Sequence, residues 1–487
     1  MTRDVYKNGQ WSAGDGPAFQ KTCPASDEVV WSGHAASGAQ VEAAVGAARA
    51  AFAPWALRPQ AERIAILEAY ADALTSRRDA IARAISRDMG KALWESLSEA
   101  DAMAAKVAIS VKAQAERAGQ KSAAAAFGTI DLGHRPHGVM AVIGPFNFPG
   151  HLPNGHLVPA LLAGNTCVFK PSELAPSVAA LMVEAFEAAG LPQGCLNVVH
   201  GGREVGSAVL NARIDGLLFT GSVEAGLAFH RHFAGRPQII LALEMGGNNP
   251  LIVWNPADVE AAADIVFTSA FVTTGQRCSC ARRLILPEGG FGDDVLTALV
   301  ERIRTVPIGA WDQDVFMGSV VSAPAAQAAL RFESDLLTSG AKPVQAFEHP
   351  FGPGAFLRPA LIDVTHARDV PDTELFGPLL QVTRVRDFDS AIDRANATRF
   401  GLAAGFVGDD DDLWRKAYSH LNAGVLTRNR PTAGAPSSLP FGGPGLSGNH
   451  RPSAYYAADY CAWPQATQSA QKAVRQTPAG YGGGFGR

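Results

Sequence analysis

The chain has 487 residues, 47% of them hydrophobic and 18% charged, and its formal net charge is −4 at pH 7. This composition is typical of a globular protein of two or three domains, and the small net charge gives no electrostatic case for a nucleic-acid or anionic-membrane partner. The first eleven residues lack the apolar core of a signal peptide, and no segment has the roughly 18 uninterrupted apolar residues of a membrane span. We therefore expect a cytoplasmic protein with neither a nucleic-acid nor a membrane partner.

Helical periodicity dominates the N-terminal part of the chain, from residue 37 to about residue 120. Apolar residues recur there every three or four positions, and Ser37 followed by Gln40 predicts a capping box at the first helix. After about residue 128, short apolar runs alternate with helical stretches, which predicts α/β domains with largely parallel sheets. The first series of strands is expected at residues 138–143, 166–169, 196–200, 217–219, 239–243 and 251–254. A second series is expected at residues 283–286, 380–385, 404–407 and 424–427.

Two short segments in the first series could carry chemistry. The strand that ends at Phe219 runs through Thr220-Gly221 into a helix that starts near Ser222. The free N–H groups at such a helix start suit a pyrophosphate, although an ordinary strand–turn–helix connection explains the pattern equally well. Further on, Glu244 ends an apolar strand before the flexible Gly246-Gly247 turn. Strand ends are where α/β enzymes place reactive groups, so Glu244 is either a base with a raised pKa or a solvated charge.

A third segment, Gly275-Gln276-Arg277-Cys278, places a cysteine after a helix at a glycine turn. An adjacent cation lowers a thiol pKa and favours the nucleophilic thiolate, so Arg277 is expected to activate Cys278. A buried packing role is the alternative for any cysteine, and it is the role we expect for Cys280. No second Cys/His pair stands at metal-binding spacing, so no metal site is predicted. The six cysteines are Cys23, Cys167, Cys195, Cys278, Cys280 and Cys461.

Together and in this order, the segments resemble the aldehyde dehydrogenase superfamily over a stretch from about Tyr6 to Trp463. The resemblance rests on the motifs Pro145-Phe146-Asn147-Phe148-Pro149, Lys170-Pro171-Ser172-Glu173, Phe219-Thr220-Gly221-Ser222, Glu244-Met245-Gly246-Gly247, Gly275-Gln276-Arg277-Cys278, Glu374-Leu375-Phe376-Gly377-Pro378 and Pro440-Phe441-Gly442-Gly443. It implies an α/β protein with a Rossmann-like cofactor domain, an α/β catalytic domain and a small β oligomerisation arm. The cofactor domain would comprise residues 1–116 and 136–244, and the catalytic domain residues 245–446. The oligomerisation arm would comprise residues 117–135 and 447–470, followed by a flexible tail at residues 471–487. Such an arm adds a strand to a neighbour's sheet, which implies a homodimer or homotetramer.

The resemblance also implies a chemistry. Cys278 would attack a small-molecule aldehyde to give a thiohemiacetal, with Asn147 and the Cys278 backbone N–H as the oxyanion hole. Hydride transfer to NAD would leave a thioester, and Glu244 would activate the water that releases the carboxylic acid. A carboxylate at Glu173 should repel the 2′-phosphate of NADP, so NAD is the expected cofactor. The residues implied for cofactor binding are Lys170, Glu173, Gly221, Ser222, Gly226, Glu374 and Phe376.

Four stretches resemble one branch of this family more specifically, the N-succinylglutamate 5-semialdehyde dehydrogenases of bacterial arginine catabolism. They are residues 148–156, 244–250, 429–432 and 447–456, and the second contains the Asn248-Asn249 pair that the branch shares. The substrate of that branch carries two carboxylates besides its aldehyde, so a matching cavity should supply cations. The candidates for substrate contact are Arg277, Arg430, His450 and Arg451, with Phe441 near the substrate tunnel.

Three other functions stay open on the sequence. The first is an aldehyde dehydrogenase for another semialdehyde, and the second is a non-redox cysteine esterase. The residues implied for the cofactor, such as Glu173, Ser222 and Glu374, argue against the esterase. The third is a non-catalytic binding protein, against which the presence of both Cys278 and Glu244 argues.

Overall fold

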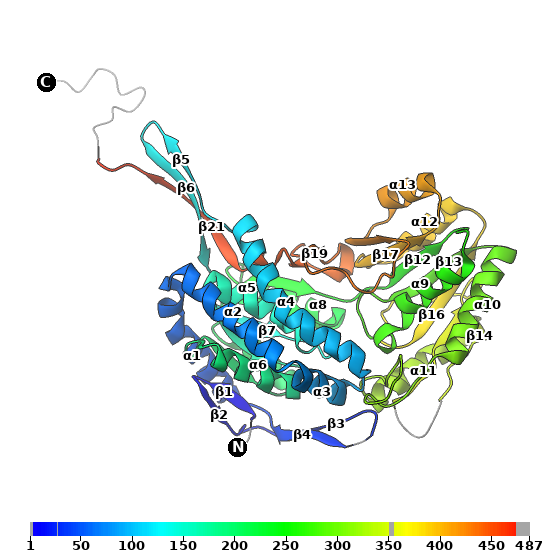
Figure 1. Cartoon of the computed structure of the whole chain (residues 1–487), viewed down its shortest axis with the longest axis horizontal. Helices are drawn as coiled ribbons and strands as arrows, with labels where there is room; N and C mark the ends of the chain where they lie inside the picture. The colour runs from blue at the N-terminus through cyan, green and yellow to red at the C-terminus, as the bar shows by residue number, and fades with distance from the viewer. Residues whose placement is uncertain (1–2, 27, 350–354, 474–487) are drawn as a thin grey trace.

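The computed structural model describes residues 3–26, 28–349 and 355–473. Two halves lie side by side, each built around a seven-stranded, mainly parallel sheet with helices against it (Figure 1). The predicted α/β class is therefore confirmed. Of the predicted flexible tail, residues 474–487 lie outside the described residues. Within the described part of the chain, no helix is both long and apolar enough to cross a membrane.

The first sheet has the strand order β11-β10-β7-β8-β9-β1-β2. The five strands from β11 to β9 are parallel, and β1 and β2 extend the other edge in antiparallel pairing. Because β7 and β8 are buried along their whole length, they read as continuous apolar runs, as expected for strands that are covered on both faces. The strands are β1 (Val5–Lys7), β2 (Gln10–Ser12), β7 (Val139–Ile143), β8 (Thr166–Lys170), β9 (Leu196–Val199), β10 (Gly216–Thr220) and β11 (Ile240–Glu244).

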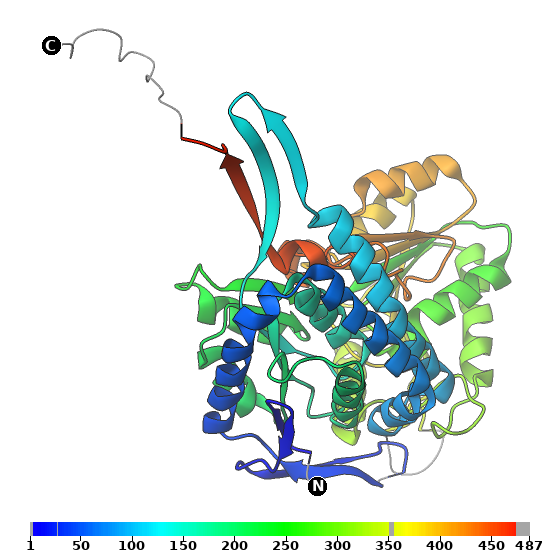
Figure 2. The same cartoon turned by 60° about the vertical axis from the view of Figure 1, so that its left-hand side comes forward.

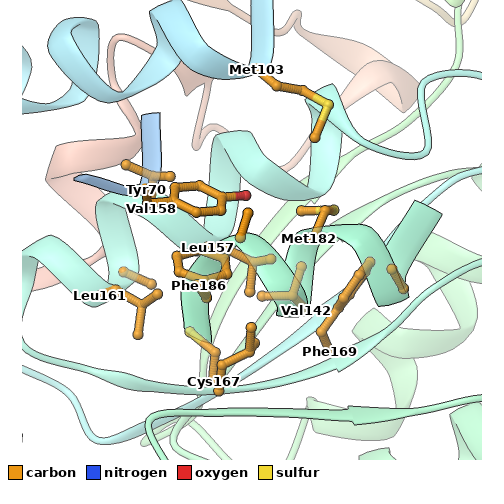
Figure 3. Close-up of a cluster of buried hydrophobic side chains, with 14 of the residues drawn as sticks. Tyr70, Met103, Val142, Leu157, Val158, Leu161, Cys167, Phe169, Met182 and Phe186 are labelled. Carbon is orange, nitrogen blue, oxygen red and sulfur yellow. The ribbon is translucent and has the colours of Figure 1, made fainter. Parts of the chain in front are cut away.

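Helices cover both faces of the first sheet. One hydrophobic cluster joins α2, α4, α5 and α6 to one face, and a second joins α1, α7 and α8 to the other. Figure 3 shows part of the first cluster, in which the rings of Tyr70 and Phe186 stack 3.6 Å apart, centroid to centroid. The predicted capping box is present, since Ser37 and Gln40 exchange hydrogen bonds at the start of α1. The helices are α1 (Gly38–Leu57), α2 (Gln60–Ser76), α3 (Arg78–Met89), α4 (Leu93–Arg117), α5 (His151–Ala163), α6 (Ser177–Ala188), α7 (Arg203–Asn211) and α8 (Val223–Phe233).

The second sheet has the order β14-β15-β16-β13-β12-β17-β18, and only β14 runs antiparallel to its neighbour. Its strands are β12 (Asn249–Val253), β13 (Ala281–Pro287), β14 (Lys342–Gln345), β15 (Ala360–Asp363), β16 (Leu379–Val385), β17 (Ala403–Val407) and β18 (Val425–Arg428). The helices around it are α9 (Val259–Phe271), α10 (Gly290–Thr305), α11 (Ala323–Thr338), α12 (Phe388–Asn396) and α13 (Asp411–His420). A short 3-10 turn, η1 (Val272–Gly275), follows α9 and leads to Cys278.

A long three-stranded ribbon projects from the first half of the molecule (Figure 2). It pairs β6 with β5 on one side and with β21 on the other, so that segments from the middle and the end of the chain meet. Exposed apolar side chains, among them Phe127, Ile130 and Trp463, lie on this ribbon. The remaining elements are β3 (Ala18–Thr22), β4 (Val29–His34), β5 (Lys121–Ala125), β6 (Gly128–Pro136), β19 (Pro440–Phe441), η2 (Gly445–Ser447), β20 (Ser453–Ala454), α14 (Ala457–Tyr460) and β21 (Ala462–Ser469).

Candidate active site

Cys278 lies where two cavities meet. The larger cavity, of about 600 Å³, opens along the carboxyl ends of β10 and β11 and includes Glu244 and Glu374 in its wall. The smaller cavity, of about 280 Å³, lies between α4, α5 and the segment that carries Cys278. Both cavities share Cys278 and Phe441 in their walls. A ligand held in either cavity can therefore reach the same sulfur atom.

A strained turn positions the cysteine. Thr273, Thr274 and Gly275 all have left-handed backbone conformations, with φ of 55°, 54° and 69°. Such angles are costly for threonine and persist only where the surroundings impose them, which is common at functional sites. At Gly275 a side chain would collide with the carbonyl oxygen of Gly377, so only glycine fits. The sequence Gly-Gln-Arg-Cys thus follows a turn that fixes where Cys278 points.

The side chain of Asn249 holds the same segment from the opposite side. Its Nδ2 donates to the carbonyl oxygens of Cys278 (2.7 Å) and Cys280 (2.8 Å). Its Oδ1 accepts from the backbone N–H of Ala403 (3.0 Å), so one buried amide joins three chain segments. The sequence did not identify this role, although Asn249 belongs to the Asn-Asn pair that marks the specific branch.

Asn147 is buried beside the nucleophile and lines the larger cavity. Its Nδ2 donates to the carbonyl oxygen of Gln276 (2.9 Å), and its Oδ1 accepts from the backbone N–H of Phe148 (3.1 Å). The amide nitrogen carries two N–H bonds, and only one of them has a partner among the described residues. The second N–H is a fixed donor next to Cys278, suited to an oxygen that gains negative charge.

The electrostatic surroundings of the thiol correct one expectation. Burial raises the pKa of Cys278, and the carboxylates of Glu374 and Glu244 raise it further. Arg277 does not activate the thiol, because its guanidinium lies 3.2 Å from the buried carboxylate of Glu95. The cation that lowers the pKa of Cys278 is the buried Arg282, and burial outweighs its effect. Cys278 is therefore a neutral thiol at rest and needs a base to become a nucleophile.

Glu244 ends β11 and is almost fully buried, so it is not a solvated charge. Its Oε1 accepts from the backbone N–H of Ser453 (3.1 Å), and its Oε2 has no partner among the described residues. Burial raises the pKa of this carboxyl well above its usual value. A buried carboxyl group with one unsatisfied oxygen and a raised pKa has the properties of a general base or acid.

Glu374 and Phe376 also line the larger cavity. Burial raises the pKa of Glu374 to about 7, although the backbone N–H of Gly247 donates to its Oε1 at 3.0 Å. A side chain at Gly246 would occupy the position of the Glu374 carboxylate. The Gly246-Gly247 turn therefore serves to bring Glu374 into the site, close to the cysteine.

The other residues predicted for the cofactor divide into two groups. Ser222 caps α8, where its side chain accepts from the N–H of Ala225 (3.3 Å), and it lines the larger cavity with Gly221 and Glu173. Lys170 and Gly226 do not line that cavity.

Contacts with neighbouring segments account for these two positions. The Nζ of Lys170 donates to the carbonyl oxygens of Pro171 and Gly201, both at 2.7 Å, and lies 3.3 Å from Glu173. Lys170 thereby orients the loops around Glu173. At Gly226 a side chain would collide with Met245, so this glycine lets α8 pack closely.

The five residues predicted for substrate contact also separate. Arg277 and Phe441 line the smaller cavity. Arg430 is exposed and lines neither cavity, and His450 and Arg451 line a different hollow, with His230 and Trp463. Of these five residues, the structure therefore brings Arg277 and Phe441 into the same cavity wall as Cys278, and not the other three.

The smaller cavity contains ionisable residues that the sequence did not single out. Lys106, His151 and His156 lie in its wall. Burial lowers the pKa of Lys106 to about 8 and those of His151 and His156 to about 4 and about 3. A signal for Lys106 existed in the sequence, since it recurs at spacings of three and four residues along one face of α4 with Glu95, Ser98, Glu99 and Ala102.

Comparison with known proteins agrees with these features. Residues 11–465 match the model of the aldehyde dehydrogenase family. The chain is 54% identical over 478 residues to N-succinylglutamate 5-semialdehyde dehydrogenase 2 of Caulobacter vibrioides, covering 97% of this chain and 98% of that protein. It is 53% identical over 466 residues to N-succinylglutamate 5-semialdehyde dehydrogenase of Pseudomonas fluorescens, covering 95% and 96%.

Solved structures give the same result. The crystal structure of methylmalonate-semialdehyde dehydrogenase from Oceanimonas doudoroffii matches with a TM-score of 0.92 and 25% identity, over 97% of this chain and 99% of that one. An aldehyde dehydrogenase from Brucella melitensis biovar abortus matches with a TM-score of 0.90 and 28% identity, over 97% and 98%. The family and the fold predicted from the motifs are confirmed, and the chain belongs to the aldehyde dehydrogenase family.

Proposed function

We propose that the chain oxidises N-succinyl-L-glutamate 5-semialdehyde to N-succinyl-L-glutamate with NAD, a step of arginine catabolism. The observation that carries the proposal is the position of Cys278 at the junction of two cavities, beside Asn147 and Glu244. One cavity can then hold a cofactor and the other a substrate. The names of the relatives that are 50–54% identical over nearly the whole chain support this choice of substrate.

The larger cavity fits NAD. The N-terminus of α8, with Ser222 as its cap, lies in its wall and would bind the pyrophosphate. Glu173 would accept from a ribose hydroxyl, and Glu374 with Phe376 would hold the nicotinamide end. Since Glu173 is half-exposed and carries a negative charge, it disfavours a 2′-phosphate. Bound NAD would supply the two-electron oxidant of the reaction.

The first half of the reaction takes place on Cys278. The thiol of Cys278 passes its proton to a base from solvent, its sulfur bonds to the aldehyde carbon, and the carbonyl electron pair moves to the oxygen to give the anion of a thiohemiacetal. The free N–H of the Asn147 side chain donates to that oxygen as its charge develops. Oxidation of the carbon then leaves a thioester between Cys278 and the substrate.

The second half requires a base and a water molecule. Glu244 in its ionised form would accept a proton from water while the water oxygen bonds to the thioester carbon. The carbon–sulfur bond breaks, and the sulfur leaves as a thiolate that is ready for another aldehyde. Burial raises the pKa of Glu244, so the carboxylate is a stronger base than in water once it is ionised.

Steady-state NADH formation tests the proposal. We expect kcat/KM for N-succinylglutamate 5-semialdehyde to exceed that for glutamate and succinate semialdehydes by at least about tenfold. A higher value for another semialdehyde would overturn the substrate assignment. Ester hydrolysis without NADH formation from any aldehyde would favour the esterase alternative instead. Cys278→Ser should abolish turnover, and retention of full activity would refute the mechanism.

We further propose that the enzyme is a cytoplasmic homodimer or homotetramer in which the projecting ribbon binds a neighbouring subunit. The exposed Trp463 on β21 and Ile130 on β6 support this role, because exposed apolar strand surfaces favour association. All six cysteines are free thiols, as expected in a reducing compartment. Light scattering on the purified protein tests the assembly. A monomer at micromolar concentration would contradict it.

A further inference from the structure

Lys106 is an unpaired buried cation in the wall of the smaller cavity. It projects from α4 and is only 2% exposed, yet its Nζ has no hydrogen-bond or ion-pair partner among the described residues. Gly155 of α5 lies beside its side chain, since a Cβ there would be in van der Waals contact with the Cε of Lys106, at 3.6 Å. Burial of an ammonium group without a partner is costly, so proteins retain one where a ligand supplies the partner.

The other charges around this cavity cancel. Glu95 pairs with Arg277 at 3.2 Å, and Glu99 pairs with the buried Lys91 at 2.6 Å. The two histidines in the wall are neutral at pH 7, because burial lowers their pKa values to about 4 and about 3. Lys106 is therefore the single unmatched charge among the described residues of the cavity wall, and the charge is positive.

From this geometry we propose that Lys106 binds a carboxylate of the substrate, and specifically the succinyl carboxylate. The inference rests on the proposed function, which supplies a substrate with two carboxylates. A carboxylate in the cavity would give the ammonium group its missing partner and would form a charge-assisted hydrogen bond away from bulk water.

The position of Lys106 along α4 favours the carboxylate farther from the aldehyde. Arg277 adjoins Cys278 in the chain, and its partner Glu95 lies on the first turn of α4. Lys106 follows Glu95 by eleven residues on the same face, a separation of about 16 Å along the helix axis. Lys106 and the partner of Arg277 thus stand about three helical turns apart on α4. Lys106 suits the succinyl carboxylate at the end of the substrate farther from the aldehyde, whereas Arg277 is the candidate for contact with the α-carboxylate.

Lys106→Met tests the proposal, because methionine keeps the length of the side chain and removes its charge. The measured quantity is the ratio of kcat/KM for N-succinylglutamate 5-semialdehyde to kcat/KM for the N-acetyl analogue, which lacks the second carboxylate. We expect Lys106→Met to lower this ratio by about thirtyfold or more, as for the loss of one partner of a buried charge pair. The matched control is Lys112→Met, on the exposed face of the same helix, which should leave the ratio unchanged.

Thermal unfolding separates binding from a structural role. Removal of an unpaired buried charge should leave the Tm of the protein unchanged or raise it, while a structural lysine would lower the Tm without changing the ratio. An unchanged ratio in Lys106→Met overturns the proposal. Equal losses on both substrates also overturn it, since they would assign Lys106 to the α-carboxylate.

Kinetic measurements on the wild-type protein distinguish failure of the Lys106 proposal from failure of the proposed function. If it prefers another carboxylate-bearing aldehyde, the substrate assignment is wrong, and Lys106→Met is then compared on that aldehyde and its neutral analogue. If it has no preference for anionic over neutral aldehydes, both proposals fall.

Discussion

The two cavities that meet at Cys278 differ in their ionisable groups. The larger cavity presents the carboxyl groups of Glu173, Glu244 and Glu374, while the smaller cavity has Lys106 as its unmatched charge. The carboxylates that raise the pKa of the thiol both belong to the larger cavity. The contrast indicates that burial, together with the carboxyl groups of the larger cavity, keeps the cysteine protonated at rest, and that Lys106 of the smaller cavity attracts an anionic molecule toward it. Mutations on each side should therefore have separable effects.

The largest effect is expected from Glu244→Gln, on the side of the larger cavity. Loss of the base should lower kcat by about 10³-fold, within the usual range for general base catalysis. Neither the deprotonation of Cys278 by a base from solvent nor its attack on the aldehyde needs Glu244, so the thioester should accumulate. Intact-protein mass spectrometry after addition of substrate and NAD should detect the added mass. Turnover at the wild-type rate would show that Glu244 is not the base.

Asn147→Ala acts at the boundary between the cavities. Removal of the donor to the developing oxyanion should lower kcat by about 10²-fold, with a much smaller change in KM. Steady-state kinetics with NAD at saturation measure both constants. A loss of less than about tenfold in kcat would contradict the oxyanion role. A rise in KM alone would show that the amide only helps to bind the substrate.

Asn249→Ala tests whether the Asn249 side chain supports the cysteine segment that both cavities share. The substitution removes three hydrogen bonds and leaves buried partners unsatisfied, so the free energy of unfolding should fall by about 2–4 kcal/mol. Urea denaturation measures the change. Asn422→Ala, at an exposed position, is the control and should change stability by less than about 0.5 kcal/mol. An equal loss in both variants would contradict the supporting role.

The smallest effect is expected from Glu374→Gln, which sharpens the electrostatic contrast. The Glu374 carboxylate raises the pKa of Cys278, so its removal should move the alkylation profile of the thiol to lower pH. The effect should be largest above pH 7, because the pKa of Glu374 is about 7 and the charge exists only above it. Peptide mass spectrometry after iodoacetamide treatment measures Cys278 alone. Glu301→Gln, on the exposed side of α10, is the control, and identical profiles for both variants would refute the effect.

Sequence reasoning identified the family, the capping box and most parallel strands of the two large sheets, because these depend on contiguous motifs and local periodicity. It placed residues 251–254 in the first series, whereas β12 belongs to the second sheet, and it missed β14 and β15. It did not identify the ion pairs and supporting hydrogen bonds around the nucleophile, because those depend on contacts between distant segments. Arg277 adjoins Cys278 in the chain but pairs with Glu95, 182 positions away. The roles of Lys106 and Asn249 could not be predicted for the same reason. Lys106 acquires its role only when α4 packs beside the cysteine segment, and Asn249 only when β12 does. Burial likewise reversed the expected direction of the thiol pKa.

The hydrogen bond from Asn147 to Gln276 also has a mechanical consequence. Asn147 follows β7 of the first sheet, whereas Gln276 and Cys278 precede β13 of the second and are held there by Asn249. Glu244, in turn, ends the last strand of the first sheet. A rotation of one half against the other would thus change the separation of sulfur, amide and carboxylate together. The catalytic distances therefore depend on the alignment of the two halves, so that a rotation of one half against the other would disengage the site.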